Sequence, residues 1–411
     1  MTLIKRAEFD PALSSFVANP NARQELSFSD GAEKSISAMG MKAAKQCVSI
    51  WDGYQVTSLT PLPGLAKELR ISSLVYKDEG SRFGLGSFKA LGGAYAVYQL
   101  LSRMITQATG IEGINSTDLK NGIYAEQIKD VTVSSATDGN HGRSVAWGAQ
   151  QFGCNCVIYI HAEVSHGRLV ALEEQGATVV RVDGNYDQSV HVCAEQSDSN
   201  GWHVVSDTSY EGYKEVPTNV MEGYSILASE IVDQVNLVPP THVFVQGGVG
   251  GLAAAVNAAF WQAWETERPL FYIVEPDLAP CIYKSVEDQA PTNVDVETET
   301  IMAGLSCGEI SLVAWDVLAQ GANGAMVIPD SFVGPTMRLL AEGCANDTAI
   351  VAGESAVAGL AGLIVARGSE TLSKLLQLDE NSRVVVIGSE GATDVDIYRQ
   401  LVGELADKVL S

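Results

Sequence analysis

Short apolar segments that alternate with helix-like segments restrict the fold of this chain more than any other feature. From Val131 onward each apolar stretch is followed by a longer stretch with helical spacing. Such alternation predicts an α/β fold, with a parallel sheet covered by helices on both faces. The strands are expected at Ile71–Asp78, Val131–Ser135, Cys154–His161, Ala177–Asp183, His203–Ser206, Val243–Gln246, Phe271–Val274, Met326–Ile328 and Val384–Ile387.

Two segments lie outside this alternation. Gly31–Ala44 has helical spacing, and Ser29 and Asp30 before it offer N-caps, so the sequence predicts a helix there. Residues 106–130 are polar and contain three glycines. They are interpreted as a surface insertion between one helix and the next strand.

Lys89 lies near the carboxyl end of an expected strand, where ligands bind in folds of this kind. It follows the strand Leu74–Asp78 and the loop Glu79–Gly86, and it falls in the first turn of the expected helix Lys89–Leu101. The positive end of a helix dipole disfavours a cation, so a lysine there indicates an amine with a lowered pKa. Schiff-base chemistry requires such a neutral amine. The alternative is a solvated surface lysine.

A glycine-rich loop, Gln246–Leu252, joins another expected strand to an alanine-rich helix. Its four glycines allow several backbone N–H groups to face one anion at the start of the helix. The loop therefore indicates a phosphate site, yet it matches neither the dinucleotide fingerprint nor the Walker motif. The alternative is a tight turn without a ligand.

Three further strand ends carry polar side chains. Asp138 and Asn140 follow one strand, Asp207 follows a second, and Ser389 follows the last strong strand. A hydroxyl such as that of Ser389 can donate a hydrogen bond to a ring nitrogen. Helix or loop capping explains the two aspartates and Asn140 equally well, and a simple turn explains Ser389. His141 is interpreted as a packed or capping histidine.

The composition narrows the class of partner. Lys and Arg number 26 against 50 Asp and Glu, a net charge of −24, which disfavours nucleic-acid binding. No secretory signal and no apolar run of about 18 residues is visible, so no membrane association is expected. The seven scattered cysteines are typical of a reduced, cytoplasmic protein. No cluster has metal-ligand spacing, so no metal is expected.

Taken in order, the lysine of Ser-Phe-Lys89, the Asn140-His-Gly turn, the Gly-Gly-x-Gly-Gly loop and the turn at Ser389 resemble the fold-type II pyridoxal-phosphate enzymes, over about residues 55–400. This superfamily includes tryptophan synthase β and threonine dehydratase. Four longer segments are similar to the 2,3-diaminopropionate ammonia-lyases in particular: Arg82–Gly93, Ala136–His141, Asp207–Tyr213 and Thr300–Glu309.

The resemblance implies an organisation of the chain. It implies two domains, each with a mostly parallel sheet flanked by helices, and an active site in the cleft between them. Residues 1–90 with 225–411 would form the large cofactor-binding domain, and residues 91–224 the small domain. A homodimer is expected by the same resemblance.

The resemblance also assigns the cofactor, pyridoxal 5′-phosphate, to particular residues. Lys89 would bind it covalently, Asn140 would contact its ring hydroxyl, and Ser389 would contact its ring nitrogen. A serine at the nitrogen leaves it largely unprotonated, which suits β-elimination better than transamination. The phosphate would be held by Gly247, Gly248, Val249, Gly250 and Gly251.

The implied reaction converts 2,3-diaminopropionate, in both the D and the L form, to pyruvate and ammonia. Asp138 and Asp207 would be the acid–base pair, Asp138 serving the D-isomer and Asp207 the L-isomer. Gly86-Ser87 and Ser306 depart from the family pattern without removing a chemical group, so the substrate among β-amino and β-hydroxy amino acids is not fixed.

Other interpretations stay open at this point. A serine or threonine dehydratase or a racemase would use the same cofactor, and a carrier or regulatory protein could bind it without catalysis. The sequence does not decide whether a cation is required. Cys281 and Cys307 are the candidates for a functional thiol pair, although the composition favours free thiols.

Overall fold

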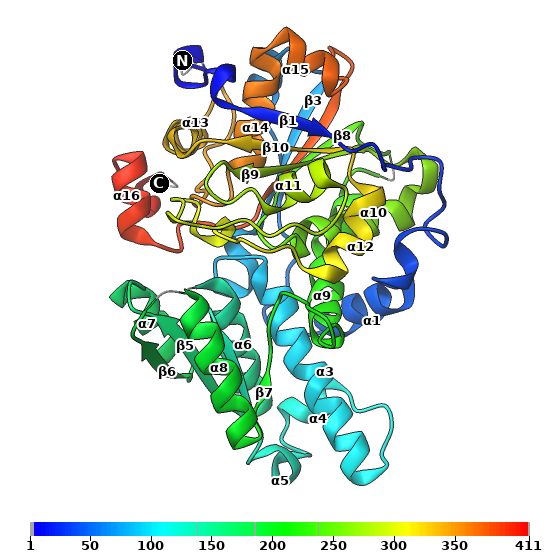
Figure 1. The fold of residues 1–411 in the computed structure, drawn as a ribbon, viewed down its shortest axis with the longest axis vertical. Coiled ribbons are helices and arrows are strands. Elements are labelled where there is room, and N and C mark those ends of the chain that lie inside the picture. The colour runs from blue at the N-terminus through cyan, green and yellow to red at the C-terminus, as the bar shows by residue number, and fades with distance from the viewer. Residues whose placement is uncertain (1–3, 138, 185, 237, 410–411) are drawn as a thin grey trace. The chain divides into compact units, whose positions relative to one another are not determined.

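The computed structural model describes residues 4–137, 139–184, 186–236 and 238–409, and it confirms the α/β class (Figure 1). The chain forms two compact units. The first comprises Met1–Ala38, Val56–Phe88 and Leu227–Ser411, and the second comprises Met39–Gln55 and Lys89–Ile226.

Within its described residues, the first unit contains a seven-stranded sheet of order β1-β10-β9-β8-β11-β3-β2. The central strands from β10 to β3 run parallel, and the edge strands β1 and β2 are antiparallel to their neighbours. The strands are β1 (Ser15–Ala18), β2 (Leu59–Pro61), β3 (Ser73–Asp78), β8 (His242–Gln246), β9 (Leu270–Pro276), β10 (Gly324–Ile328) and β11 (Arg383–Gly388).

Helices bury the central strands of this sheet. Every residue of β8 and of β10 is buried, as expected for a parallel sheet covered on both faces. The helix α14 is buried from Ala358 to Ala366, so it belongs to the core itself. The helices of this unit are α2 (Pro63–Leu69), α10 (Gly251–Trp264), α11 (Cys281–Asp288), α12 (Leu312–Gly321), α13 (Val333–Glu342), α14 (Ala358–Gly368), α15 (Glu370–Leu375), α16 (Val395–Val402) and α17 (Ala406–Val409).

The second unit contains a parallel sheet of order β6-β5-β4-β7. Helix α6 packs closely on α3, where Ser144 Oγ accepts a hydrogen bond from the Ala94 amide (3.1 Å). The elements are β4 (Thr132–Ala136), β5 (Asn155–His161), β6 (Thr178–Val182), β7 (His203–Val204), α3 (Lys89–Thr109), α4 (Ser116–Lys120), α5 (Ala125–Ile128), α6 (Asn140–Phe152), α7 (His166–Glu173) and α8 (Tyr186–Asn200). Two more helices, α1 (Ala38–Val48) and α9 (Glu215–Gln234), begin or end in the first unit.

The first helix begins later than the sequence predicts. The pattern favours a helix over Gly31–Ala44, but α1 starts at Ala38 and continues to Val48. The Glu33 carboxylate accepts a hydrogen bond from the Ala38 amide (3.1 Å) and so caps the helix at that point. The residues before it form only a short 3₁₀ turn.

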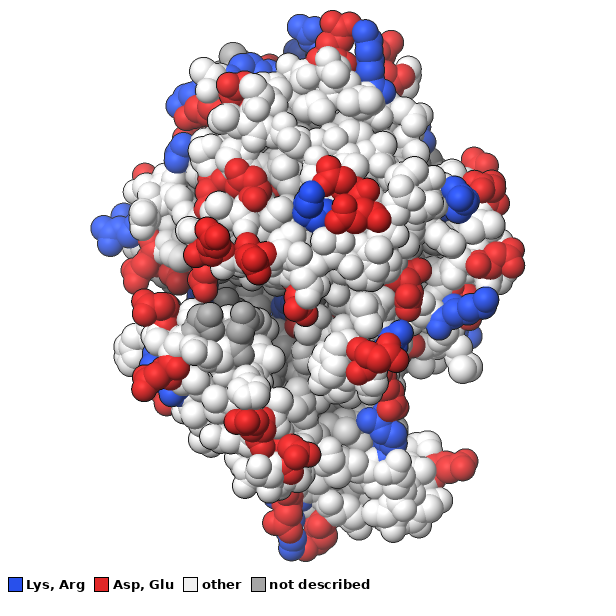
Figure 2. All heavy atoms as spheres, in the orientation of Figure 1, with Lys and Arg blue, Asp and Glu red and all other residues white. Residues whose placement is uncertain are grey.

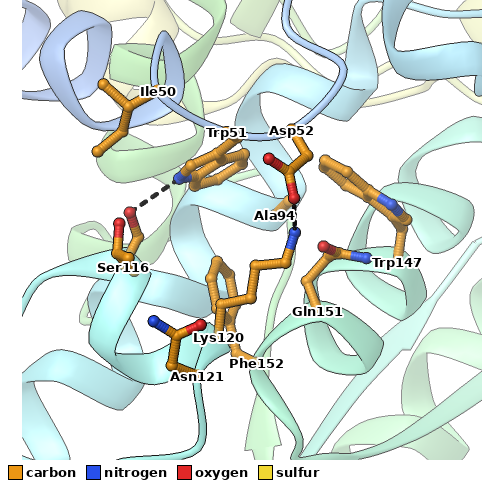
Figure 3. A pocket seen from close by; sticks show the side chains of 11 residues that line it. Ile50, Trp51, Asp52, Ala94, Ser116, Lys120, Asn121, Trp147, Gln151 and Phe152 are labelled. Carbon is orange, nitrogen blue, oxygen red and sulfur yellow. Dashed lines mark hydrogen bonds and ion pairs between the residues drawn. The ribbon is translucent and has the colours of Figure 1, made fainter.

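Residues 39–55 belong to the second unit, whereas the predicted large domain includes them. Trp51 provides the physical reason (Figure 3). Its ring lies 5.9 Å from that of Trp147 and 5.6 Å from that of Phe152, and its Nε1 donates to Ser116 Oγ (3.0 Å). Packing between distant segments decides this assignment, and no local pattern shows it.

Residues 106–130 are more than a surface insertion. Helix α3 continues into the segment as far as Thr109, and α4 and α5 follow. Ile114, Leu119 and Ile128 are buried, so the segment contributes apolar side chains to the second unit.

The distribution of charged side chains on the surface agrees with the net charge of −24. Figure 2 shows acidic side chains spread over the face that it draws, without a basic patch among them. In the described part of the chain, no helix is both long and apolar enough to cross a membrane.

Candidate active site

Lys89 is the first residue of α3, and hydrogen bonds of the first unit fix the residues before it. The Phe88 amide donates to the Ser389 carbonyl (3.0 Å), and the Gly391 amide donates to the Gly86 carbonyl (3.0 Å). Ser87 and Glu390 form an isolated β-bridge beside them. The turn that leads to Lys89 is therefore bound to the loop that follows β11.

The Lys89 ammonium lies among side chains of the second unit. It forms an ion pair with Asp207, and its Nζ lies 5.6 Å from the centre of the Tyr224 ring. The Lys89 and Asp207 side chains are 20% and 17% exposed, so a small molecule can reach them. Sequence reasoning identified both residues but did not predict that they form a pair.

Asp207 is held as a carboxylate. Burial would raise the pKa of Asp207, but the nearby charge of Lys89 and the hydrogen bond from its ammonium act in the opposite direction, so the pKa lies well below its usual range. The group is therefore a base and an anion at neutral pH.

Hydrogen bonds also hold the loop that contains Asp207. The hydroxyl of Tyr213 donates to the Val204 carbonyl (2.9 Å) and accepts from the Ser206 amide (3.1 Å). The Thr208 amide donates to Ser206 Oγ (3.2 Å). These hydrogen bonds fix the backbone on both sides of Asp207 and so restrict the direction of its carboxylate.

His141 is packed, as the sequence predicts, but it also faces this carboxylate. Its Nε2 donates to the Val205 carbonyl (2.9 Å), and its Nδ1 lies 3.9 Å from Asp207 Oδ2. Burial lowers the pKa of His141. The imidazole is therefore neutral at neutral pH, and its Nδ1 has no hydrogen-bond partner in the described structure.

Asn140 and Asp138 are the other two polar residues that the sequence predicts at the site. Asn140 is the first residue of α6 and is partly exposed. Asp138 lies outside the described residues.

The glycine-rich loop of the first unit has a backbone that only glycine adopts readily. Gly248 and Gly250 have φ angles of +67° and +90°. A Cβ on Gly247 would lie 2.5 Å from Cγ of Glu275. Val249 lies between them, its carbonyl accepts from the Ser311 amide (2.9 Å), and α10 begins at Gly251. This narrow turn at a helix N-terminus fits a phosphate.

Glu275, on β9, lies directly behind this loop. Its carboxyl group accepts hydrogen bonds from the Ile282 amide (2.9 Å) and the Tyr283 amide (2.6 Å) at the start of α11. Burial raises its pKa to about 8, so the group is largely uncharged at neutral pH and does not repel an anion in the loop. The sequence analysis did not identify Glu275, although a glutamate at the end of an apolar strand is a signal that could have found it.

Ser389 follows β11 and has one hydrogen bond that sets its direction. Gln246 Nε2 donates to Ser389 Oγ (2.6 Å) and to the Ile387 carbonyl (3.0 Å). Because Ser389 Oγ accepts the amide hydrogen, its own proton is left for another acceptor. A pyridine nitrogen is an acceptor of this kind.

The proposed thiol pair is not bonded. No disulfide joins Cys281 and Cys307, which agrees with the composition. Cys281 Sγ instead lies 3.5 Å from the Gly248 carbonyl and 3.7 Å from Glu275 Oε1. Its thiol fills the space behind the glycine loop, and burial raises its pKa well above the usual range.

Comparison with known proteins places these features in a family. A family model described as pyridoxal-phosphate dependent enzyme matches residues 50–390. The diaminopropionate ammonia-lyase of Escherichia coli (strain K12) is 39% identical over 368 residues, 88% of this chain and 91% of that protein. That of Salmonella typhimurium (strain LT2) is 36% identical over 361 residues, 85% of this chain and 88% of that protein.

Solved structures agree. A crystal structure of the Escherichia coli diaminopropionate ammonia-lyase in complex with D-serine has a TM-score of 0.86 and 37% identity, and the match covers 95% of this chain and 96% of that one. A second, with an aminoacrylate–PLP azomethine reaction intermediate, has a TM-score of 0.83 and 36% identity over the same shares. The resemblance seen in the sequence is thereby confirmed: the chain belongs to the fold-type II pyridoxal-phosphate-dependent enzymes and, among them, to the family of the diaminopropionate ammonia-lyases.

Proposed function

We propose that this protein removes ammonia from both enantiomers of 2,3-diaminopropionate by α,β-elimination. One water is consumed per substrate, and the products are one pyruvate and two ammonia. The observation that carries the proposal is the pair of Lys89 and Asp207, an amine and a carboxylate in contact at the start of α3. The relatives named diaminopropionate ammonia-lyase support the substrate.

Pyridoxal phosphate fits the residues present. The glycine loop of residues 247–251 would hold its phosphate, because the turn is narrow and the carboxyl group behind it is largely uncharged at neutral pH. Ser389 would donate to its ring nitrogen, Asn140 would contact its ring hydroxyl, and Lys89 would bind it covalently. When bound, this cofactor withdraws electrons from Cα of an attached amino acid, which makes the Cα proton acidic.

Asp207 would perform two tasks. As a carboxylate it attracts the β-ammonium of the substrate and keeps that group protonated, and an amine leaves only in its protonated form. It is also a base that can accept the Cα proton, if that proton comes within about 3 Å. Lys89 is the second base beside it.

Asp138 would serve the D-isomer. The enantiomers present the Cα proton to opposite faces of the cofactor ring, and one base cannot reach both within hydrogen-bond distance. Asp207 is therefore assigned to the L-isomer and Asp138 to the D-isomer. Family resemblance supports this division.

The ratio of products tests the substrate. D- and L-2,3-diaminopropionate, D- and L-serine and threonine are supplied separately, and pyruvate or 2-oxobutanoate is measured together with ammonia. Two ammonia per pyruvate, with the diamine as the fastest substrate, is the expected result. One ammonia per pyruvate, with serine turned over faster than either diamine, would identify a serine dehydratase instead.

A homodimer in the cytoplasm completes the proposal. Family resemblance supports the dimer, and cysteines without a disulfide suit a reducing compartment. Sedimentation equilibrium measures the assembly, and a mass of one chain at micromolar concentration would contradict it.

A further inference from the structure

A group of charged side chains is buried in the first unit, and all of them except Glu230 come shortly before Lys89 in the chain. The side chains of Lys77, Glu79, Arg82 and Glu230 are at most 1% exposed. Arg82 lies at the centre. Its Nε and one terminal nitrogen donate to both oxygens of Glu79 (2.8 Å each), and its two terminal nitrogens donate to both oxygens of Glu230 (2.9 and 2.8 Å).

Lys77 completes the group and balances its charge. Its Nζ lies 2.6 Å from Glu230 Oε2, and it also donates to the Thr57 carbonyl (2.9 Å) and to Gln234 Oε1 (3.0 Å). Two cations and two carboxylates therefore meet without net charge. Buried ion pairs lose much of their attraction to desolvation, so they add little stability over an apolar core. Their best-established use is to fix one arrangement of the chain.

The arrangement to be fixed here is an unusual turn. Phe83, Gly84 and Gly86 have φ angles of +52°, +70° and +78°. Left-handed backbone at a residue other than glycine costs free energy and persists only where the surroundings impose it. The far end of the turn is bound to the loop after β11, as described above. Its near end is Arg82, whose guanidinium is held by the carboxylates of Glu79 and Glu230 and by Thr57 Oγ1 (3.1 Å).

We propose that Arg82 is a positioning residue, which by its two bidentate pairs with Glu79 and Glu230 holds the turn that presents Lys89 to the cofactor. A guanidinium can pair with two carboxylates through parallel hydrogen bonds, and an ammonium cannot. A misplacement of about 1 Å at a reacting group lowers rates by roughly 10²-fold, so the geometry of this turn matters for turnover. The inference rests on the proposed function, in which Lys89 is the attachment site.

The test uses a variant with balanced charge. Arg82→Met with Glu79→Gln removes one cation and one carboxylate, and it leaves Lys77 paired with Glu230. Holoenzyme is reduced with borohydride at limiting pyridoxal phosphate, and peptide mass spectrometry measures the fraction of Lys89 that carries the cofactor. The rate of pyruvate formation and the thermal midpoint of the apo-protein are measured on the same samples.

Arg268→Met is the matched control. Arg268 is a buried arginine of the same unit, but it donates to backbone carbonyls of residues 23 and 24 and stacks on Trp261 (3.9 Å). The double variant is expected to lose Lys89 labelling and kcat by at least tenfold beyond the control at a similar midpoint, and Arg82→Lys to lose both in part.

Two outcomes would overturn the inference. Labelling and kcat within twofold of the control in the double variant would show that Arg82 serves only stability. If the double variant does not fold, Arg82→Lys decides alone, and parent-like labelling, kcat and wavelength of the bound cofactor would exclude the positioning role. Absence of Lys89 labelling in the parent would instead contradict the proposed function.

Discussion

At the scale of single residues, the site depends on contacts that join distant parts of the chain. Lys89, His141 and Asp207 lie far apart in sequence, yet Lys89 and His141 both face the Asp207 carboxylate in the second unit. Sequence reasoning found Lys89 and Asp207 because each lies at a predicted strand end. It could not find the pairing or the orientation of His141, because both depend on how α3, α6 and the segment after β7 pack.

Asp207→Asn tests the role of this carboxylate. The change keeps the size of the side chain and removes its charge, so activity on L-2,3-diaminopropionate should fall by about 10²-fold or more. Activity on the D-isomer should fall much less. Steady-state kinetics with each enantiomer measures this, and equal losses would mean that Asp207 serves binding or structure for both.

At the scale of elements, the fold was predictable where a local pattern determines the structure. The alternation of apolar and helical segments predicts β4, β5, β6, β8, β9 and β11 at their observed positions to within a few residues. It does not predict the start of α1, which Glu33 sets, or the unit to which Trp51 belongs. The start of α1 depends on the Glu33 side chain, and the assignment of residues 39–55 depends on the packing of the Trp51 side chain.

The glycine loop before α10 gives a prediction about the cofactor. Gly248→Asp places a carboxylate in a turn suited to an anion and strains a backbone with φ +67°, so the affinity for pyridoxal phosphate should fall. Gly403→Asp is the matched control, because Gly403 has φ +95° with open space around it and terminates α16. Equal cofactor affinity in the two variants, measured by titration of apo-protein, would place the phosphate elsewhere.

The buried Glu275 between β9 and α11 predicts a pH dependence of stability. Its pKa is about 8 in the folded protein and about 4.3 in an unfolded chain. Between these values the folded state binds more protons, so the free energy of unfolding falls as pH rises, by at most about 1.4 kcal/mol per pH unit.

Glu275→Gln should remove this dependence. Relative to the parent, the variant should gain stability from pH 5 to pH 8 and change little above pH 8. Urea unfolding at several pH values measures it, with Glu370→Gln, at a residue 84% exposed, as the control. A difference that is the same at every pH would contradict a neutral Glu275.

At the scale of the whole molecule, the charge of −24 predicts a response to salt. Acidic side chains repel one another across the surface, and added ions screen that repulsion within about 10 Å at 0.1 M. The thermal midpoint should therefore rise by a few degrees between 0.02 and about 0.3 M potassium chloride. A midpoint that falls over this range would show that attractive ion pairs dominate.

Lys89 gives the most direct test of the account as a whole. Lys89→Ala and the control Lys374→Ala, at a lysine 76% exposed, are each loaded with pyridoxal phosphate, and pyruvate and ammonia are measured with both enantiomers of 2,3-diaminopropionate. The parent and Lys374→Ala should release two ammonia per pyruvate at equal rates, and Lys89→Ala should release neither product above background. Near-parental turnover by Lys89→Ala would contradict the assignment of Lys89 and, with it, the site described here.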